Sequence, residues 1–308
     1  MSYVDVSQTI TLNSPGVLFT FEDKFSFGVS VRDTVAFVMQ IKTDTCLTAI
    51  NIKDKAIIQS FGTSGHGPND VNMPTFISSI DHSDILLQDG IANRFNKIEF
   101  NPSLNQYTVS KYMTYSHKIF RSGETNISQN FISGRTVIDV DYYPPIKNLN
   151  KRLDFNYIYA PSIALNEGKN RIIIGMFHFD IFQIYDLSGN RLKTCYLSDK
   201  CIPEFYKSED QETVMQKCEM GFIRSFSTKD YCYFLRIARD FPNNKTKLHM
   251  LIQTDWEGEL INAYYIPDEV LGHFFIDEQN KKMYIIRHSI VQESAVNEIF
   301  ELVSYQLQ

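Results

Sequence analysis

Basic side chains follow directly after several apolar, β-rich runs of the sequence. Arg135 ends FISGR, Arg236 ends FLR and Arg287 ends IIR, with Arg239 and His288 close behind them. Guanidinium groups that converge on one site attract carboxylate, phosphate or sulfate groups through charge-assisted and often bidentate hydrogen bonds. The pattern therefore predicts recognition of an anionic or glycan-like ligand, if the fold brings these residues together.

Two further residues follow apolar runs in the same way. With them, the candidate ligand-binding set is Arg94, Arg135, His178, Arg236, Arg239, Arg287 and His288. Aromatic side chains suited to recognition stand in the neighbouring loops, namely Tyr142, Tyr143, Phe177 and Phe179. The alternative interpretation is that each arginine pairs with a local acid such as Asp89, Asp139 or Asp240, as isolated loop charges usually do.

Familiar catalytic motifs are missing. GTSGH fails the G-x-S-x-G pattern because His66 stands where the second glycine is needed. GHGPND fails the G-x-G-x-x-G pattern, and the sequence contains neither HExxH nor a phosphate-binding P-loop. The net charge of −6, from 30 basic and 36 acidic side chains, argues against duplex binding through a basic surface. We therefore predict no catalytic residue, no cofactor and no nucleic-acid partner, and the sequence selects no metal ligands.

The elements that would position these residues form a repeat. A short apolar strand, a polar turn, a second β-rich strand and a third strand recur about every 50 residues. The second strands begin at Val35, Ile85, Phe131, Arg171, Tyr231 and Met283. Six units, each able to form a four-stranded sheet, predict one all-β domain over residues 1–308, a six-bladed β-propeller. In a propeller the loops after the second strands meet at one end of the channel, which would gather the basic residues.

The two ends of the chain predict closure of the ring. After Leu271 the last unit offers only three strands, whereas YVDVSQTITL near the N-terminus alternates apolar and polar residues. We therefore expect Val4–Leu12 to pair into the blade that holds Met283–Ile286, which would remove two free sheet edges.

Two local patterns punctuate the repeat. D-x-x-G spacing between apolar runs, at Asp186–Gly189 and Asp255–Gly258, predicts hairpins in which the glycine adopts a positive φ. Residues 199–220 lengthen one interval, and the capping-box pattern S-E-D-Q at Ser208 predicts a short helical insertion there. This helix would either decorate the surface or cover the channel mouth.

The stretch SFGTSGHGPNDVNMP concentrates residues that favour turns, namely Gly62, Gly65, Gly67, Pro68 and Pro74. The glycines permit backbone angles that other residues avoid, and the prolines fix the exit and begin a strand. A structural corner between two blades explains them better than a ligand loop. Further along, Asp89 and Asn93 can hydrogen-bond a turn that Arg94 braces.

This part of the chain resembles the repeat of the NHL family and of the related bacterial six-bladed TolB-like propellers. Such repeats read roughly F-G-x-x-G-x-G-P-G-x-F-x-x-P, then D-x-x-x-N-R. Phe61, the five turn residues and the later Asp89, Asn93 and Arg94 match, whereas Asn69 and Val71 depart from the pattern. The match covers one blade. It implies a propeller of the kind that many Bacteroides-type bacteria export as lipoproteins.

Cysteine content and the chain start bear on the compartment. The cysteines are Cys46, Cys195, Cys201, Cys218 and Cys232. An odd number without a CxxC pair predicts mostly buried free thiols, and the alternative is pairing of Cys201 with Cys195 or Cys218. No apolar run reaches the roughly 18 residues of a membrane span, and MSYVDVSQTI does not resemble a signal peptide. We expect a periplasmic or outer-surface protein if the sequence is a mature form, and a cytoplasmic one if Met1 is the true start.

Three classes of function remain open from the sequence. The preferred class is a non-catalytic, monomeric binding protein whose propeller mouth recognises an anionic or glycan-like ligand or a protein partner. The second is a metal-dependent hydrolase or lyase with its site in the central channel, because Glu, Asn and Asp are available as ligands. The third is a purely structural interaction platform. Basic and aromatic residues suit recognition better than binding of a hard cation, which favours the first class.

Overall fold

The structure of the protein is a computed structural model. It describes residues 2–22, 24–41, 43–65, 67, 70–71, 74–77, 85–89, 94–114, 119–122, 126–129, 131–133, 136–138, 162–197, 221–240, 245–291 and 297–308. These residues form strands β1 to β26 and no helix, so the predicted all-β class is confirmed. The described part of the chain accordingly holds no helix of the length and apolarity that a membrane crossing needs. The predicted helical insertion at 199–220 lies outside the described residues.

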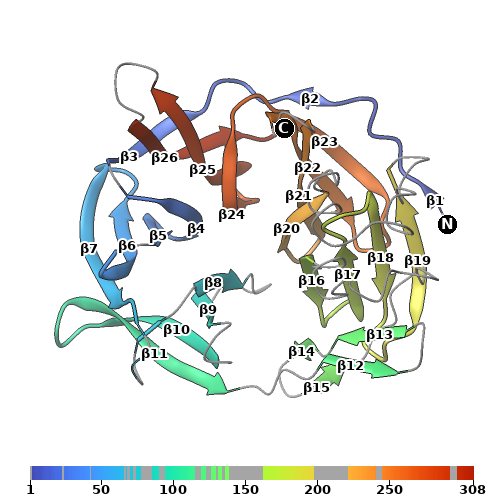
Figure 1. Ribbon diagram of the computed structural model, residues 1–308, viewed down its shortest axis with the longest axis horizontal. Helices are drawn as coiled ribbons and strands as arrows, with labels where there is room; N and C mark the ends of the chain where they lie inside the picture. Colours follow the sequence, from blue (N-terminus) through green and yellow to red (C-terminus); the bar gives the residue numbers. More distant parts are fainter. Residues whose placement is uncertain are drawn as a thin grey trace. The chain divides into compact units, whose positions relative to one another are not determined.

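Two compact units are formed from interleaved segments of the chain. Unit 1 contains Met1–Thr11 and His117–Pro267, and unit 2 contains Leu12–Ser116 and Asp268–Gln308. The chain therefore passes from one unit to the other three times. Figure 1 identifies the strands of each unit by their labels.

Unit 2 contains three four-stranded sheets. The first is antiparallel and consists of β4 (Ser26–Arg32), β5 (Val35–Gln40), β6 (Thr45–Asn51) and β7 (Ala56–Thr63). The second is antiparallel and consists of β8 (Pro74–Ile77), β9 (Ile85–Asp89), β10 (Arg94–Asn101) and β11 (Gln106–Thr114). The third consists of β24 (Val270–Asp277), β25 (Lys282–Val291), β26 (Asn297–Gln306) and β3 (Gly16–Glu22). One parallel bridge, His273 to Gly28, joins the first and third sheets into a single curled sheet of eight strands.

Unit 1 contains two more sheets of the same order. One consists of β16 (Ser162–Asn166), β17 (Arg171–Gly175), β18 (Ile181–Tyr185) and β19 (Arg191–Tyr196). The other consists of β20 (Phe222–Ser227), β21 (Tyr231–Asp240), β22 (Lys245–Asp255) and β23 (Leu260–Ile266). Two separate hairpins join β12 (Ile119–Ser122) to β13 (Asn126–Gln129) and β14 (Phe131–Ser133) to β15 (Thr136–Ile138).

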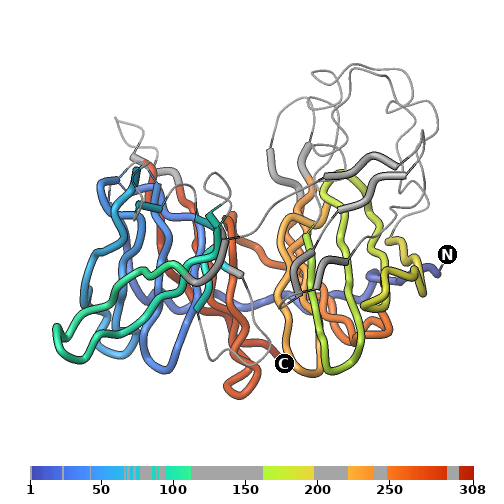
Figure 2. Tube along the Cα trace, turned by 90° about the horizontal axis from the view of Figure 1, so that it is seen from below, coloured from blue at the N-terminus to red at the C-terminus, as the bar shows by residue number. Residues whose placement is uncertain are grey.

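The predicted second strands all coincide with strands of the structure. Five of them, β5, β9, β17, β21 and β25, occupy the second position of a four-stranded sheet. Phe131 begins β14, whose described partner is β15 alone. Four strands in up-and-down order form the sheet unit of a β-propeller blade. Figure 2 shows β4 to β7 and β16 to β19 as consecutive lengths of the chain that run up and down within one sheet.

The predicted pairing of Val4–Leu12 with the last sheet is wrong. The strand that completes this sheet is Gly16–Glu22, which runs antiparallel to β26 and pairs Phe21 with Phe300. Residues 4–12 instead connect two short strands, β1 (Ser2–Tyr3) and β2 (Ile10–Thr11), which add in parallel to the outer edges of β19 and β23. The apolar alternation breaks at the turn in which Ser7 N donates to Asp5 Oδ1, whereas GVLFTFE is an unbroken β-rich run.

The cores lie between neighbouring sheets of each unit. In unit 1, Phe182 of β18, Phe222 of β20 and Phe234 of β21 pack together with Trp256. In unit 2, Phe37 and Leu87 belong to the core between the first two sheets. A further core in unit 2 packs β3 and β26 against β4 and β5. The inner strands β5, β6, β17 and β18 are almost completely buried, whereas the outer strands β7 and β19 are partly exposed.

The two D-x-x-G turns form the predicted hairpins. Gly189 has a φ of 83° and Gly258 a φ of 79°. Asp186 Oδ1 accepts hydrogen bonds from the backbone of Ser188 and Asn190, each of 2.9 Å. Asp255 accepts in the same way at the β22–β23 turn. In both hairpins the register shifts by a bulge beside the turn, as this type of connection requires.

Candidate functional site

Arg236, one of the predicted basic residues, lies in the middle of β21 in unit 1. Its Nε and Nη2 donate to the two carboxylate oxygens of Asp180 at 2.7 and 2.8 Å, a bidentate pair. Asp180 ends the turn between β17 and β18, on the neighbouring sheet. The side chains of Arg236 and Asp180 are 12% and 19% exposed, so solvent or a ligand still reaches both.

A fixed backbone holds this turn in place. Gly221 N donates to Phe177 O at 2.5 Å, and Phe222 N donates to Met176 O at 3.2 Å. A Cβ atom at Gly221 would come within 2.7 Å of Phe179 O, so only glycine allows the close approach. We refer to Phe177, His178, Asp180, Gly221 and Arg236 as the β17–β18 loop site.

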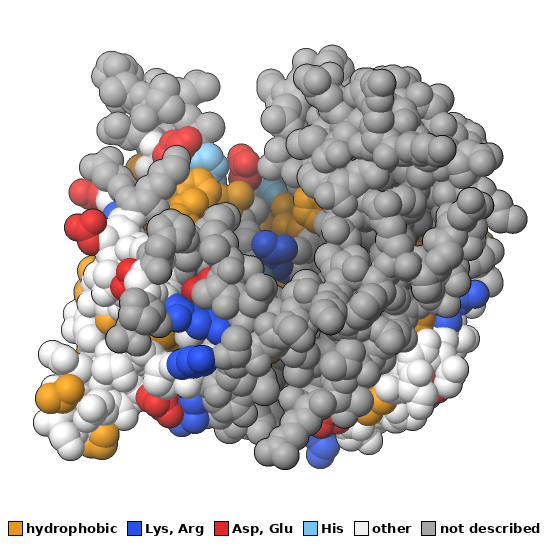
Figure 3. Space-filling view, turned by 60° about the horizontal axis from the view of Figure 1, so that its bottom comes forward, with side chains coloured by type: hydrophobic (Ala, Val, Ile, Leu, Met, Phe, Trp, Pro, Cys, Tyr) orange, Lys and Arg blue, Asp and Glu red, His pale blue; other side chains and the backbone are white. Residues whose placement is uncertain are grey.

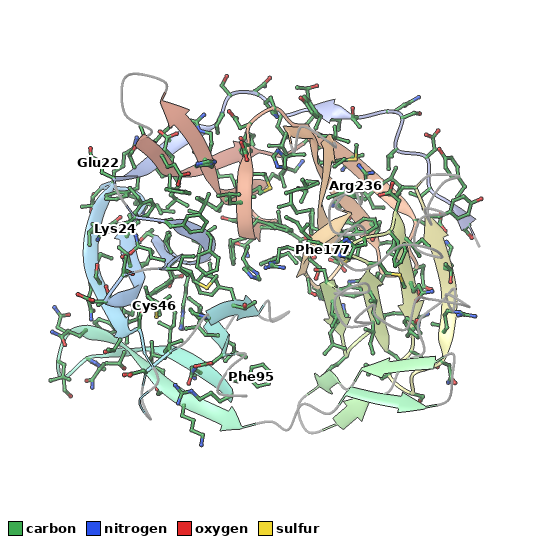
Figure 4. The ribbon with its side chains drawn as sticks, in the orientation of Figure 1. Glu22, Lys24, Cys46, Phe95, Phe177 and Arg236 are labelled. Carbon is green, nitrogen blue, oxygen red and sulfur yellow. The ribbon has the colours of Figure 1, made fainter. Side chains whose placement is uncertain are left out.

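Aromatic side chains flank the pair. Phe177 is half-buried, and its ring meets the buried ring of His178 edge to face, with centroids 4.6 Å apart. Phe179 is almost completely buried beneath the turn. Figure 4 labels Phe177, which comes from the β17–β18 turn, and Arg236, which comes from β21. His178 lies in the β17–β18 turn, whereas Arg236, which the sequence placed in a loop after the second strand, lies within β21 itself, because this strand extends to Asp240.

A second predicted arginine, Arg287 of β25 in unit 2, is surrounded by acids. Its Nε and Nη2 donate to Glu301 Oε2 at 2.8 and 2.6 Å, and its Nη1 lies 3.4 Å from Asp268 Oδ1. Tyr305 Oη donates to the other oxygen of Asp268 at 2.6 Å. Burial disfavours the charged guanidinium, but the hydrogen bond and charge of Glu301 outweigh it and raise the pKa of Arg287. Burial and the Asp268 carboxylate raise the pKa of Tyr305 strongly.

The neighbouring His288 is held on both sides. Its backbone N donates to Glu269 O at 2.9 Å, and its Nδ1 lies 3.9 Å from Glu269 Oε1. Its ring stacks on Phe300 with centroids 5.0 Å apart. This arrangement makes His288 a packed side chain of the β25–β26 hairpin with one edge toward an acid.

The third described arginine, Arg94, braces a hairpin as predicted for the D-x-x-x-N-R pattern. Arg94 begins β10 opposite Asp89, the last residue of β9, and their side chains are 3.5 Å apart. Asp89 is fully buried and Arg94 is 8% exposed. This pair is therefore part of the interior of its sheet.

The glycine-rich stretch connects β7 to β8. Gly62 has a φ of 74° at the end of β7. Gly67 N donates to Asp70 Oδ2 at 2.7 Å, and this carboxylate fills the space that a Cβ at Gly65 would need. Pro74 begins β8. Gly65 and Gly67 therefore both lie directly against the Asp70 side chain.

Several predicted residues lie outside what the structure describes. These are Arg135, Pro68 and Asn93, with the aromatic Tyr142 and Tyr143. For Arg239 the structure describes the backbone, which pairs with Thr246 in β22. The basic residues whose side chains are described fall into two groups: His178 and Arg236 in unit 1, and Arg94, Arg287 and His288 in unit 2.

Sequence reasoning missed the acids that hold these arginines and one further cation. Asp180, Asp268 and Glu301 do not stand out by type or spacing, although Asp89 was named as a partner of the arginines. Arg224 of β20 is the missed cation, because it follows no second strand. Its Nη1 donates to Ile223 O at 2.7 Å, no carboxylate pairs with it among the described residues, and burial lowers its pKa.

The buried thiols and the acidic groups define no metal site in the described ranges. Cys46, Cys195 and Cys232 are free and buried, as predicted for most of the thiols, and the alternative pairing of Cys195 with Cys201 is therefore excluded. Burial raises the pKa of Cys46 and of Cys195 to about 11. Among the residues that the structure describes, no group of three His, Cys, Asp or Glu side chains could hold a metal ion.

Comparisons with known proteins give similarity at the level of solved structures only, since no family model and no curated protein matches. A member of the DUF4221 family from Bacteroides vulgatus is 14% identical with a TM-score of 0.49, over 97% of this chain and 96% of that chain. A luciferin-regenerating enzyme is 10% identical with a TM-score of 0.47, over 94% and 95%. The calcium-binding protein regucalcin from Agrobacterium tumefaciens is 10% identical with a TM-score of 0.43, over 100% and 97%. At these scores the likenesses assign this chain neither a family nor an activity, and the NHL and TolB-like resemblance stays a prediction.

Proposed function

We propose that this chain is a non-catalytic binding protein whose β17–β18 loop site recognises a polar ligand rich in hydrogen-bond acceptors, such as a glycan or a small anion. We further propose that its four-stranded sheets are blades of a six-bladed β-propeller, with this loop site on one rim. A periplasmic or outer-surface location would suit such a binding protein. A partner protein whose surface carries similar hydrogen-bond acceptors could bind at the same site.

The proposal rests on the number of N–H donors of the Arg236 guanidinium that are used within the protein. Of its five N–H donors, two are used by Asp180. The remaining three make no hydrogen bond within the described part of the chain. The carboxylate fixes the plane of the guanidinium, and a ligand therefore meets donors that are already oriented, which reduces the entropy cost of binding.

Pairing with Asp180 also favours one kind of ligand over another. The carboxylate offsets the charge of Arg236, so attraction for a simple anion is weaker than for an unpaired arginine. A glycan can accept hydrogen bonds from the guanidinium, donate to the carboxylate and lay a ring face on Phe177. On the face shown in Figure 3, the described side chains include basic, acidic and hydrophobic ones.

Binding to a printed glycan array, with neutral, uronic-acid and sulfated members, tests the proposal. We expect selective binding that falls about tenfold or more in Arg236→Ala, because each charge-assisted contact contributes roughly 1.5–3 kcal/mol. Arg236→Lys keeps a positive charge beside Asp180 but loses the planar set of donors, and it should lose binding to a similar extent. The matched control is Arg171→Ala, since Arg171 also pairs with a carboxylate in unit 1, Glu257 at 2.8 Å.

The outcomes separate the classes of function. Equal binding by wild type and both Arg236 variants would reject the site, and absence of binding to every array member would reject the glycan ligand. Chemical change of a bound oligosaccharide during incubation would instead favour a hydrolase or lyase. Circular dichroism of each variant distinguishes lost recognition from lost folding.

A further inference from the structure

A pocket of about 410 Å³ lies within unit 2, between the first and second four-stranded sheets. Its floor consists of Phe37 of β5, Ile85 of β9 and Ile98 of β10, whose exposures are 1%, 5% and 2%. The pocket shares no residue with the β17–β18 loop site. Its volume is in the range of sites that bind small organic molecules.

One wall of the pocket is aromatic. The ring of Tyr107 in β11 meets that of Phe37 edge to face, with centroids 5.0 Å apart, and the tilted ring of Phe100 has its centroid 5.1 Å from that of Tyr107. A line of rings therefore leads from the buried floor to the rim. Phe100 is 50% exposed, which leaves apolar surface that a ligand could cover.

Arg32 and Asp33 form the polar side of the mouth. Both are exposed at the β4–β5 turn, where Asp33 has a φ of 54°. In Figure 2 this turn and the β10–β11 turn lie at the same end of unit 2. Neither side chain makes an ion pair or a hydrogen bond within the described residues. By contrast, the other two charges of the pocket are paired, with Lys97 Nζ 3.5 Å from Glu99 Oε1.

The pKa of Tyr107 reflects the closeness of Arg32 and Asp33 to the aromatic wall. Burial raises the pKa of the Tyr107 phenol, while the nearby positive charge of Arg32 lowers it and the negative charge of Asp33 raises it. Both charges therefore act at the aromatic wall. The pocket thus combines an apolar floor, a stacking wall and one unpaired guanidinium at the rim.

We propose that this pocket binds a small organic carboxylate with an aromatic body. The ring would lie between Ile98 and Tyr107, and the carboxylate would accept a bidentate hydrogen bond from Arg32. Such a carboxylate can belong to an arylalkanoic acid or to an aromatic amino acid. In the second case the α-ammonium group would lie beside Asp33, so the two sources are distinguished by their dependence on that residue.

Titration of the full chain with phenylacetate, L-phenylalanine and benzyl alcohol, followed by ligand-observed NMR and calorimetry, tests the proposal. We expect saturable binding of one or both carboxylates at concentrations below about 10 mM. Benzyl alcohol, which lacks the carboxylate, should bind at least about tenfold more weakly. Asp33→Asn should weaken L-phenylalanine and spare phenylacetate if the amino acid is the better ligand.

Arg32→Ala should weaken the carboxylates by about tenfold or more and leave benzyl alcohol unchanged. Phe100→Ala should weaken all three probes, because it removes apolar contact that they share. Arg191→Ala is the control, since Arg191 is an exposed arginine of unit 1 that does not line the pocket. Carboxylate binding that Arg32→Ala leaves intact would overturn the proposal, as would no saturable binding by a wild-type chain with native circular dichroism. Neither result bears on binding at Arg236.

Discussion

At the scale of single residues, the three described cysteines behave as small apolar side chains. Cys46 packs in the core of unit 2, and Cys195 and Cys232 pack in the core of unit 1. Burial is the largest cause of the raised pKa at each of them. Because the thiolate is the reactive form, these residues are inert at neutral pH, and their main effect is on the pH dependence of stability.

The thiols predict a loss of stability at alkaline pH. The pKa of a cysteine in the unfolded chain is 9.0, whereas burial raises the pKa of Cys46 in the folded protein to about 11. The folded pKa is the higher one, so the stability is fully present below pH 9 and is lost as the pH rises toward 11. Each thiol should contribute a slope of about 1.4 kcal/mol per pH unit in this window.

Urea unfolding with a reductant, between about pH 8 and about pH 11, measures this slope. Cys46→Ala should be less stable than wild type near neutral pH but should have a shallower alkaline slope by about 1.4 kcal/mol per pH unit. Tyrosines and lysines titrate in the same window in both proteins, so only the difference in slope is diagnostic. Parallel curves for the two proteins would contradict the prediction.

The arginine partners illustrate how far the candidate site could be predicted. Asp89 and Arg94 flank one hairpin turn, so their pairing follows from local sequence. Glu301 lies opposite Arg287 in the β25–β26 register, and the pair could have been found by aligning that hairpin. Asp180 and Arg236 are separated by 56 residues and lie on different sheets. Their contact depends on packing, which no spacing in a single sequence encodes.

At the scale of elements, hairpin turns are the best-encoded parts of the fold. Asp and Gly at D-x-x-G spacing satisfy the turn backbone and allow the left-handed φ, so these hairpins form from local chemistry alone. The second strands were predictable for a similar reason, because β-rich runs bounded by turns recur. The pairing of the N-terminal segments could not be predicted in this way. β1, β2 and β3 each add to a different sheet edge, at β19, β23 and β26, and long-range packing decides which segment joins which edge.

The two turn glycines predict different costs of substitution. Gly189 lies between the exposed Ser188 and Asn190, so Gly189→Ala should cost only the roughly 1–2 kcal/mol of a left-handed alanine. At Gly258 an added Cβ would also come within 2.5 Å of Ile184 Cδ1 in the neighbouring sheet. Overpacking adds about 1–3 kcal/mol, so Gly258→Ala should be clearly the more destabilising change.

Chemical denaturation of both variants measures this difference, and one double variant identifies its cause. Ile184→Val removes the Cδ1 atom, so it should cost about 1 kcal/mol in the wild type and much less, or nothing, in the Gly258→Ala background. Additive free energies in the double variant would mean that the clash is relieved elsewhere.

At the scale of the whole molecule, the N-terminal residues serve both units. Residues up to Thr11 belong to unit 1, where β1 and β2 each add a two-residue parallel strand to an outer edge. Residues from Leu12 belong to unit 2, where β3 supplies seven residues to the last sheet. Because both units are made of separated segments, neither can be excised as one continuous stretch of chain.

Two N-terminal truncations should therefore differ strongly. Removal of residues 1–13 takes away β1 and β2 and leaves every four-stranded sheet complete, so the melting temperature should fall by only a few degrees. Removal of residues 1–22 also deletes β3, exposes Leu302 and Phe300, and leaves the backbone of β26 as a free edge. We expect a fall on the order of 10 °C or more, with association through that edge visible in size-exclusion chromatography. Thermal melts followed by circular dichroism compare the two truncations directly. If the shorter truncation proved as damaging as the longer one, β1 and β2 would be the strands that secure the N-terminus, and the pairing of β3 with β26 would contribute little.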